Sequence, residues 1–537
     1  MPRHRLLVTD EIDPEGVALL TGEPSFDVDE VPTLPPAELL ARIADYDAIV
    51  GRSASKISAE LLHAATKLKV VGRAGVGVDN VAVDVATARG IAVINAPAGN
   101  TVAVAELVFG GLISLLRHIP RATTGMHAGK WERSEMMGHE LKGRTLGIVG
   151  LGRIGSEVAQ RAHAFGMKVI AFDPYIAAER FQALRVQQCA TLDELLAQAH
   201  IVTLHTPLNA ETTGLIGRRE ISRLAPGSIV LNYARGGIVD EPSLVAALES
   251  GHLRGAALDA FPAEPLKGEH ALRNVPNLLL TPHLGASTYE AQRNVAVDVC
   301  AAVREALLTG ELSRSLNVAS LSGAGWSDIR PLLQLAQRAS SAARALLEDR
   351  GVKAVARLTI RCGPESIGVA SALLSAAAVG LLEGTLDDGR VNLINARSIA
   401  EARGVTLATA ESDQLGHPSA IEVVLAGALS EIAVGGMAPA GTTPRLTRIG
   451  SFHVDVSPRG TLLILRNEDV PGVIGRVGTL LGEAKLNIAE YHQARLAQGG
   501  EALAAVTIDG EVPAAVREQL LALPDVRSAT VITFPPL

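Results

Sequence analysis

Short apolar runs alternate with amphipathic stretches along the first hundred residues of the chain. The apolar runs are bounded by glycine, proline or polar residues and fall at 6–9, 48–51, 70–73 and 92–95. Helical spacing of apolar residues over 37–44 and 59–65 separates them. Strands that alternate with helices predict a parallel sheet with helices on both faces.

A long apolar helix is expected over 100–119, and a polar segment follows over 128–142. A second series of alternating strands and helices comes after them. Its strands are expected at 145–149, 168–172, 201–204, 228–232, 256–258 and 278–281. Its helices are expected at 153–164, 192–198, 243–249 and 288–308. Strands of this kind predict a doubly wound domain that binds a dinucleotide. The last helix is long enough to return to the first sheet, which would make the N-terminal domain discontinuous.

The pattern changes after Gly310. Residues 313–325 are rich in Ser, Gly and Asn, which is typical of a linker. Residues 326–455 are rich in Ala, mix helical and strand patterns, and hold no recognisable catalytic constellation. Residues 459–537 begin again with strand, helix, strand, strand, helix and strand, the order of a small βαββαβ module.

Composition narrows the class of protein. With 537 residues, 47% of them hydrophobic and 20% charged, the chain is expected to form several globular domains. A net charge of −8 argues against nucleic acid as the main partner. The N-terminus turns acidic after a short apolar run, and Glu106 interrupts the longest apolar stretch, 102–116. We therefore expect a cytoplasmic protein with no signal peptide and no membrane partner.

The three cysteines suggest no special chemistry. Cys189, Cys300 and Cys362 have neither the spacing of metal ligands nor the even number of a disulfide framework. We expect buried, reduced thiols and no metal site.

The most specific motif lies between two expected strands. Gly150, Gly152 and Gly155 form G-x-G-x-x-G after the run 145–149, and Asp173 ends the next apolar run. In such a unit the glycines permit the tight turn, the approach of a pyrophosphate and close helix–strand packing, in that order. Unpaired N–H groups at the helix N-terminus favour the phosphates. An acid at Asp173 accepts from ribose hydroxyls and repels a 2′-phosphate, which favours NAD over NADP.

Candidate acid–base residues follow three later strands. Arg235 comes after 228–232, Asp259 and Glu264 come after 256–258, and His283 comes after 278–281. Arg235 can bind a carboxylate bidentately, His283 can exchange a proton with a hydroxyl, and Glu264 can orient the imidazole. Taken alone, a His after a strand is more often a structural or surface residue, and Arg and Glu in loops are usually solvated. Together they suit hydride transfer on a 2-hydroxy acid.

Seven motifs carry a resemblance to a known family, namely GRSASKI, VGRAGVGVDN, INAPAGNTVAVAEL, GLGRIG, NYARGGIVDE, ALDAFPAEP and TPHLGAST. In this order they resemble the D-2-hydroxyacid dehydrogenase family over residues 1–310, and within it the members that oxidise 3-phospho-D-glycerate to 3-phosphooxypyruvate with NAD, the first step of phosphorylated L-serine biosynthesis. The resemblance implies that Arg235, Glu264 and His283 are catalytic. It implies cofactor contacts at Val76, Gly150, Gly152, Arg153, Ile154, Gly155, Asp173, Thr206, Ala234, Asp259 and Gly285.

The same resemblance implies substrate contacts at Arg52, Arg73, Gly75 and Asn100, and at Arg133 from a neighbouring subunit. A carboxylate needs one arginine clamp, so additional arginines at 52, 73 and 133 suit a phosphate on the substrate. For each arginine alone, a solvated or salt-bridged role fits the sequence as well.

The tail resembles the long form of the family, which adds an intervening regulatory domain and an ACT domain. Residues 467–495 carry the ACT resemblance, and 391–405 match the intervening domain loosely. The resemblance implies a homotetramer that L-serine inhibits through Asn467, Asp469 and Asn487. In the alternative, Asp469 and Asn487 only cap a helix.

The expected domains are a substrate-binding, flavodoxin-like domain (1–98 plus 286–312), an NAD-binding Rossmann domain (99–285), an α+β intervening domain (313–457) and the ACT domain (458–537). Three alternatives stay open at this point. The chain could be another reductase of the family, acting on hydroxypyruvate, glyoxylate or 2-oxoglutarate. It could be a non-enzymatic NAD sensor, or its tail could serve assembly alone.

Overall fold

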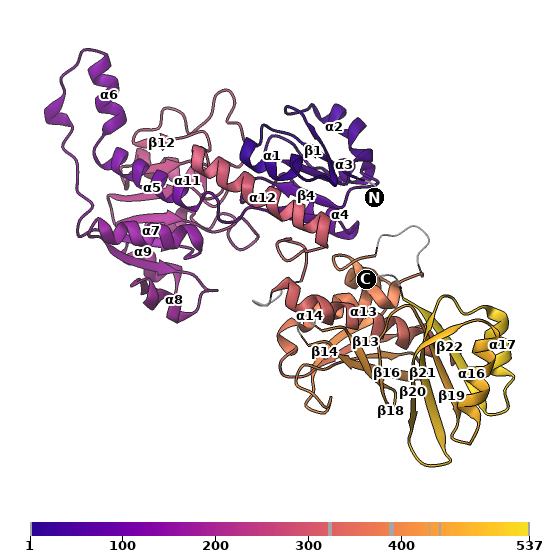
Figure 1. Cartoon of the computed structure of the whole chain (residues 1–537). Helices are drawn as coiled ribbons and strands as arrows, with labels where there is room; N and C mark the ends of the chain where they lie inside the picture. The colour runs from indigo at the N-terminus through magenta and orange to yellow at the C-terminus, as the bar shows by residue number, and fades with distance from the viewer. Residues whose placement is uncertain (1–2, 320–324, 386–390, 429, 440–441, 535–537) are drawn as a thin grey trace.

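The computed structural model describes residues 3–319, 325–385, 391–428, 430–439 and 442–534. Four sheets organise these residues, two of them parallel, one mixed and one antiparallel. In Figure 1 the parallel sheets lie in the indigo-to-pink part of the chain, and the other two lie in the orange-to-yellow part. The fold class expected from the sequence is therefore confirmed.

The first parallel sheet has the order β2-β1-β3-β4-β5, which is that of flavodoxin-like folds. Its strands are β1 (His4–Val8), β2 (Phe26–Glu30), β3 (Ala48–Gly51), β4 (Val70–Arg73) and β5 (Ala92–Asn95). Its helical segments are α1 (Pro14–Thr21), α2 (Pro36–Arg42), η1 (Ile43–Asp45), α3 (Ala59–Ala64) and α4 (Val83–Ala88). Three expected strands are confirmed to the residue, whereas α1, β2 and α4 were not expected. Strand β2 reads FDVDE at the sheet edge, where exposed acids interrupt the apolar run.

The second parallel sheet is doubly wound about its first strand, in the order β12-β11-β10-β9-β6-β7-β8. Its strands are β6 (Thr145–Val149), β7 (Lys168–Phe172), β8 (Gln187–Gln188), β9 (Ile201–Leu204), β10 (Ser228–Asn232), β11 (Leu253–Leu258) and β12 (Leu278–Leu280). The helices between them are α7 (Arg153–Ala164), α8 (Ala178–Ala183), α9 (Leu192–Gln198), α10 (Arg218–Arg223) and α11 (Glu241–Glu249). Strand β8, two exposed glutamines, has no apolar signal and was not expected.

One long helix joins the two parallel sheets. Helix α12 (Tyr289–Thr309) begins after the Thr288 cap and lies along α1 on the first sheet (Figure 1). Its Val295, Val299 and Val303 are buried in the same apolar cluster as residues of β1, β3 and β4. The expected return of this helix to the N-terminal domain is confirmed.

The expected linker at 313–325 begins as part of the first domain. Ser315 bridges to Ile94 of β5, Leu316 N–H donates to the Val93 carbonyl, and the Asn317 amide donates to Ile91. Because hydrogen bonds hold these residues against the first sheet, the prediction of a linker is wrong for residues 315–317. Residues 320–324 lie outside the described residues.

The apolar helix expected over 100–119 is divided in the structure. Helix α5 (Thr101–Leu116) packs on α7, and α6 (Ile119–His127) leaves it at 64° after His118, whose φ is +53°. A short turn, η2 (Arg133–Glu135), follows, and this arm projects from the domain in Figure 1. Among the described residues no single helix has the length and apolarity of a membrane span, and only α5 and α6 taken together reach them.

A mixed sheet of order β14-β13-β15-β16-β17-β18 forms the intervening region. Its strands are β13 (Arg357–Cys362), β14 (Thr406–Glu411), β15 (Ile421–Ala426), β16 (Glu431–Met437), β17 (Arg445–Ile449) and β18 (Phe452–Val456). Its helical segments are α13 (Trp326–Asp349), η3 (Ile367–Val369), α14 (Ala370–Leu382) and α15 (Ala396–Ala402). Helices α13 and α14 pack on each other, and most of the Ala residues of both helices are buried.

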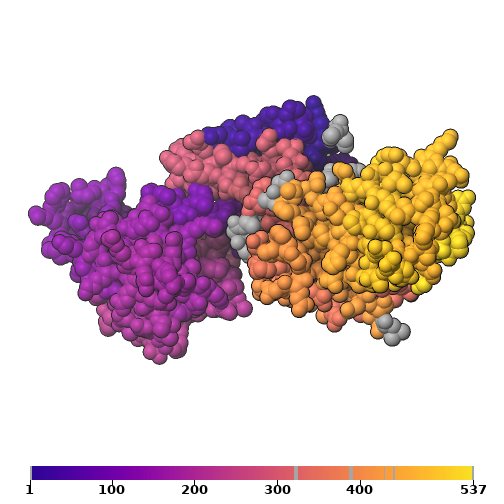
Figure 2. Space-filling model, turned by 60° about the horizontal axis from the view of Figure 1, so that its bottom comes forward, coloured from indigo at the N-terminus to yellow at the C-terminus, as the bar shows by residue number. Residues whose placement is uncertain are grey.

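The C-terminal module has the expected βαββαβ order. It comprises β19 (Thr461–Glu468), α16 (Val473–Glu483), β20 (Asn487–Arg495), β21 (Glu501–Asp509), α17 (Ala514–Leu521) and β22 (Val526–Thr533), with the sheet order β20-β21-β19-β22. One face of this sheet packs on α16 and α17. The other face, with Leu462, Ile464 and Leu503, is buried against the intervening region, and Figure 2 shows the orange and yellow segments as one mass. We propose the domain limits stated above, except that residues 315–317 belong with the first domain, and we propose that the last two domains share this core.

Candidate active site

The glycine turn joins β6 to α7. Gly150 has φ +91°, and a Cβ there would lie 2.7 Å from the carbonyl oxygen of His205. A Cβ at Gly155 would lie 2.2 Å from the Gly150 carbonyl oxygen, whereas a Cβ at Gly152 would meet no protein atom within 4 Å. The first and third glycines are thus required by the fold, and the second keeps the helix N-terminus open. Arg153 and Ile154 form the first turn of α7 above this opening.

Asp173 follows β7 and holds the glycine turn. Its Oδ2 accepts from Leu151 N–H at 2.8 Å, and its Oδ1 accepts from Tyr175 N–H at 3.0 Å. Each oxygen keeps a second lone pair for a ribose hydroxyl. Beside the turn, the hydroxyl of Thr206 is buried without a hydrogen-bond partner among the described residues. This set of donors and acceptors fits a dinucleotide.

His205, next to Thr206, is a buried neutral imidazole. Burial lowers its pKa to about 3, and its Nε2 lies 2.9 Å from Thr203 Oγ1. It adds no charge to the turn, whose positive potential comes from the N-terminus of α7 and from Arg153.

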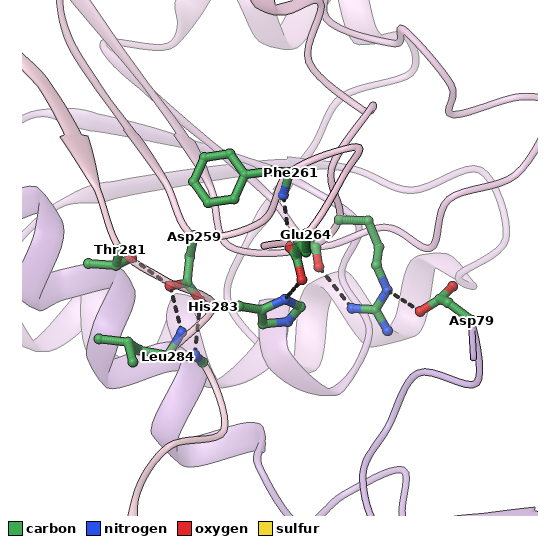
Figure 3. Close-up of polar contacts among 10 residues, drawn as sticks. Asp79, Asp259, Phe261, Glu264, Thr281, His283 and Leu284 are labelled. Atoms are coloured by element: carbon green, nitrogen blue, oxygen red, sulfur yellow. Dashed lines mark hydrogen bonds and ion pairs between the residues drawn. The ribbon is translucent and has the colours of Figure 1, made fainter. Parts of the chain in front are cut away.

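Asp259 follows β11 and shapes the loop that carries His283. Its carboxylate, 1% exposed, accepts from Thr281 Oγ1 (2.5 Å), Leu284 N–H (2.7 Å) and Gly285 N–H (2.9 Å). Burial raises the pKa of Asp259, and these hydrogen bonds act against that rise. Figure 3 shows Asp259 between Thr281 and Leu284, beside His283. Thr281 was not expected as a site residue, although it lies in the quoted motif TPHLGAST.

Glu264 and His283 form the expected pair. Glu264 Oε2 lies 2.7 Å from His283 Nδ1, and Oε1 accepts from Phe261 N–H at 2.9 Å (Figure 3). His283 adopts φ +54°, which turns the chain sharply after β12. With Nδ1 engaged, Nε2 is the ring atom that remains for proton exchange.

Arg235 lies in the loop after β10, which Asn232 stabilises. The Asn232 amide donates to the Arg235 carbonyl at 2.8 Å and accepts from Ala234 N–H at 3.1 Å. Arg235 Nη1 donates to the Ala234 carbonyl at 2.8 Å, and its Nε donates to Asp79 at 3.1 Å. Asp79 belongs to the first domain, in the motif VGRAGVGVDN, and was not expected at the site.

The first domain brings two further arginines to this region. Burial and the positive charges of Arg235 and Arg52 lower the pKa of Arg73 to about 10, whereas Asp79 and Asp10 act in the opposite direction. Arg73 Nε is buried and has no hydrogen-bond partner among the described residues. The guanidinium groups of Arg52, Arg73 and Arg235 are close enough to affect one another electrostatically. Together they favour the binding of an anion.

Asp10 holds the loop that carries Arg52. Its carboxylate accepts from the N–H groups of Arg52 (2.8 Å) and Ser55 (2.9 Å) and from Ser55 Oγ (2.8 Å). Burial favours a raised pKa for Asp10, but these hydrogen bonds outweigh it and lower the pKa. The only sequence signal for this role is an acid directly after the first expected strand.

The other substrate and cofactor positions of the first domain adjoin this loop system. Gly75 has φ +155°, and a Cβ there would overlap the Arg73 guanidinium. The Val76 carbonyl accepts from the Asn95 amide, and the side-chain oxygen of Asn100 is buried without a partner among the described residues. Gly75 and Val76 follow Arg73 directly in the chain, whereas Asn100 precedes the first residue of α5. Arg133, by contrast, is exposed on the projecting arm after α6, so the structure of one chain does not bring it to this region.

The three expected effector residues do not meet within one chain. Asn467 and Asp469 lie at one end of the last sheet, where the Asp469 carboxylate accepts from Gly499 N–H and Arg495, both at 3.1 Å. The Gly499 N–H and then Arg495 lower the pKa of Asp469. Asn487 begins β20 at the opposite end and donates to Asp509 at 2.7 Å. Helix α16 has Gly472 and Ala484 as caps, so helix capping by Asp469 and Asn487 is wrong.

The cysteines and the possible metal ligands form no cluster in the part of the chain that the structure describes. No group of His, Cys, Asp or Glu among those residues could hold a metal ion. Cys189, Cys300 and Cys362 are free and buried, and burial raises the pKa of each thiol. The expected burial of the cysteines is confirmed.

Comparison with known proteins agrees with this geometry. Residues 109–285 match the model of the D-isomer specific 2-hydroxyacid dehydrogenase NAD binding domain, and residues 461–525 match the ACT domain model. The chain is 37% identical over 531 residues to a D-3-phosphoglycerate dehydrogenase of Synechocystis sp., covering 98% of this chain and 94% of that one. It is 38% identical over 539 residues to the D-3-phosphoglycerate dehydrogenase of Bacillus subtilis, covering 99% and 100%.

Among solved structures, the TT0316 protein of Thermus thermophilus matches with a TM-score of 0.54 at 35% identity, covering 58% of this chain and 99% of that one. That share of the chain corresponds to about the extent of the first two domains. The expected NAD-binding and ACT domains are confirmed. The chain belongs to the D-isomer specific 2-hydroxyacid dehydrogenase family, among its D-3-phosphoglycerate dehydrogenases with a C-terminal ACT domain.

Proposed function

We propose that this chain oxidises 3-phospho-D-glycerate to 3-phosphooxypyruvate with NAD, the first step of phosphorylated L-serine biosynthesis, in the cytoplasm. The observation that carries the proposal is the 2.7 Å contact between His283 Nδ1 and Glu264 Oε2, at the same sheet edge as Arg235. Full-length similarity to D-3-phosphoglycerate dehydrogenases supports the choice of substrate.

The chain's own residues divide the reaction between them. Arg235 binds the substrate carboxylate and orients C2. His283 Nε2 takes the proton of the C2 hydroxyl, and Glu264 stabilises the resulting imidazolium through Nδ1–H. NAD, when bound, accepts the hydride. Gly150, Gly152 and Gly155 would hold its pyrophosphate at α7, and Asp173 its ribose.

Cofactor contacts are proposed at the remaining positions of the same sheet edge: Val76, Arg153, Ile154, Thr206, Ala234, Asp259 and Gly285. Thr206 and the buried Asp259 loop support this assignment, because both adjoin the strand ends where a dinucleotide lies in doubly wound sheets. Approach of the two domains would exclude water from the reacting atoms.

Arg52 and Arg73 are proposed to bind the substrate phosphate, with Gly75 and Asn100 beside them. The lowered pKa of Arg73, caused by burial and by neighbouring arginines, supports an anion at this place, because an anion relieves both effects. Arg133 is proposed to act from a second copy, because its own chain holds it on the projecting arm.

Initial rates with 3-phospho-D-glycerate, and with NAD or NADP, test the function directly. We expect turnover with NAD and at least about tenfold preference over NADP, because Asp173 repels a 2′-phosphate. Hydroxypyruvate, glyoxylate and 2-oxoglutarate are the comparison substrates for the reverse direction. Faster reduction of one of these than of 3-phosphooxypyruvate would favour another reductase of the family, and no turnover of any would favour an NAD sensor.

We further propose that the protein is a homotetramer inhibited by L-serine at the ACT domain. The register of β20 and β21 separates Asn467 and Asp469 from Asn487 along the sheet. Side-by-side pairing of two copies would place the two ends together, so one ligand could contact both. Serine titration of activity tests this, and the absence of any response at millimolar serine would leave the tail an assembly element.

A further inference from the structure

One ion pair links the two catalytic domains at the site. Asp79 lies in the loop after β4, and Arg235 lies in the loop after β10 of the other parallel sheet. Arg235 Nε donates to Asp79 Oδ2 at 3.1 Å between positions 156 residues apart (Figure 3). The two side chains belong to the two domains between which the substrate must be held.

The guanidinium of Arg235 is anchored on two sides. Nε is bound to Asp79, and Nη1 is bound to the Ala234 carbonyl of its own loop. Within the described residues, Nη2 makes no hydrogen bond. A Cβ at Gly77 would lie 2.0 Å from Nη2, so the group lies flat on the loop only because residue 77 is glycine. The two anchors fix the plane of the guanidinium and leave Nη2 without a fixed partner.

Within the described part of the chain, the Asp79 side chain makes no hydrogen bond other than the one to Arg235. Its side chain is 72% exposed, whereas that of Arg235 is 27% exposed. Asp10, the other acid near these arginines, is engaged by Arg52 and Ser55. Asp79 is therefore the acid that neutralises the charge of Arg235. Replacing this exposed side chain should change the free energy of unfolding little.

We propose that Asp79 is a positioning residue for Arg235, anchoring Nε from the opposite domain so that Nη2 faces the substrate carboxylate. The proposal rests on the proposed role of Arg235 as the carboxylate clamp. It makes clamp orientation depend on the approach of the two domains, because the anchor and the arginine lie on different domains. Arg235 is then correctly oriented only when the substrate-binding domain is in place.

The test is Asp79→Asn, which keeps the shape and removes the charge, in the full-length protein. We expect kcat/KM for 3-phospho-D-glycerate to fall by roughly three- to tenfold, with NADH affinity and Tm unchanged. Asp79→Glu should recover part of the loss. Asp84→Asn is the matched control, because it removes the same charge from an exposed position at the start of α4.

A double-mutant cycle decides whether Asp79 acts through Arg235. In the background Arg235→Lys, which has no Nε donor, Asp79→Asn should change kcat/KM by less than about twofold. An equal loss in both backgrounds, or wild-type kcat/KM in Asp79→Asn alone, would overturn the proposal. If the wild-type enzyme oxidises another 2-hydroxy acid instead, the proposed function fails, and the same cycle is measured with that acid.

Discussion

The two carboxylates that follow β11 have different hydrogen-bond partners and different exposure. Asp259 is buried and its two oxygens accept three hydrogen bonds, so it keeps the loop of Leu284 and Gly285 in one shape. Glu264 is 36% exposed and uses one oxygen for the Phe261 N–H and the other for His283. Glu264 therefore contacts the imidazole directly, whereas Asp259 holds the backbone beside it.

Replacing His283 tests the proton transfer at this pair. In His283→Ala we expect kcat to fall by at least about 100-fold, because general acid–base help is lost. NADH binding, measured by fluorescence titration, should persist, because the glycine turn and Asp173 are untouched. Near-normal turnover would contradict the assignment of His283.

Asp10 offers a second test at the residue scale. In Asp10→Asn we expect the free energy of unfolding to fall by about 1–3 kcal/mol at pH 7, because a buried charged acceptor of four hydrogen bonds is lost. The KM for 3-phospho-D-glycerate should rise because the Arg52 loop loosens. The folded-state pKa of Asp10 lies below its ordinary value, so its contribution is full above about pH 4 and disappears as pH falls further. Denaturant unfolding at pH 7 and pH 3 checks this, since the difference from wild type should shrink at pH 3.

The site illustrates which contacts a sequence can predict. Arg235, Glu264 and His283 were expected to lie close together because each follows a strand of one parallel sheet, and the structure places them at that edge. Asp79 was not expected, because its partner lies in another sheet and no local spacing connects them. The proposed roles of Arg133 and Asn487 depend on a second copy, whose arrangement no pattern in one chain specifies.

At the scale of elements, two glycines of the turn are in different environments, although the motif G-x-G-x-x-G does not distinguish them. Gly155 lies where a Cβ would press on the Gly150 carbonyl at 2.2 Å, whereas Gly152 has open space. The fold thus explains Gly155 but not Gly152, and the proposed pyrophosphate contact would account for the second.

Two alanine substitutions test that separation. Gly155→Ala should destabilise the protein by about 1–3 kcal/mol through overpacking between β6 and α7. Gly152→Ala should leave the free energy of unfolding within about 1 kcal/mol of wild type. NADH affinity, however, should fall by at least about tenfold, because the methyl group stands where the pyrophosphate approaches. Equal loss of stability in both variants, measured by urea unfolding, would contradict this division.

The buried parallel strands were the most predictable elements. Strands 168–172 and 201–204 were expected to the residue because both faces are covered and the apolar run is continuous. The edge strands β2 and β8 lack that run, since water reaches one side of each. The bend after α5 depends on a positive φ at His118, which no apolar spacing indicates.

At the scale of the whole molecule, residues 392–395 of the intervening region contact the first domain. The Asn392 amide donates to the Gly90 carbonyl at 2.7 Å, and the Asn395 amide donates to Ala88. Ile394, 8% exposed, belongs to the apolar cluster of the first sheet. Helix α4 ends at Ala88, Arg73 ends β4, and Asp79 lies in the loop that joins β4 to α4. A shift of the intervening domain would therefore move the segment that carries these charged groups.

Removing these contacts tests whether the proposed inhibition by serine is transmitted through them. In the double variant Asn392→Ala with Ile394→Ala we expect kcat without serine within about twofold of wild type and an inhibitory response at least about tenfold weaker. Amide hydrogen exchange at residues 88–93 should accelerate, which reports loss of the contact independently of activity. Arg397→Ala is the control, because Arg397 donates to Ser371 inside the intervening domain. Faster exchange together with full serine inhibition would place the coupling elsewhere, through the shared core of the last two domains or through a second copy.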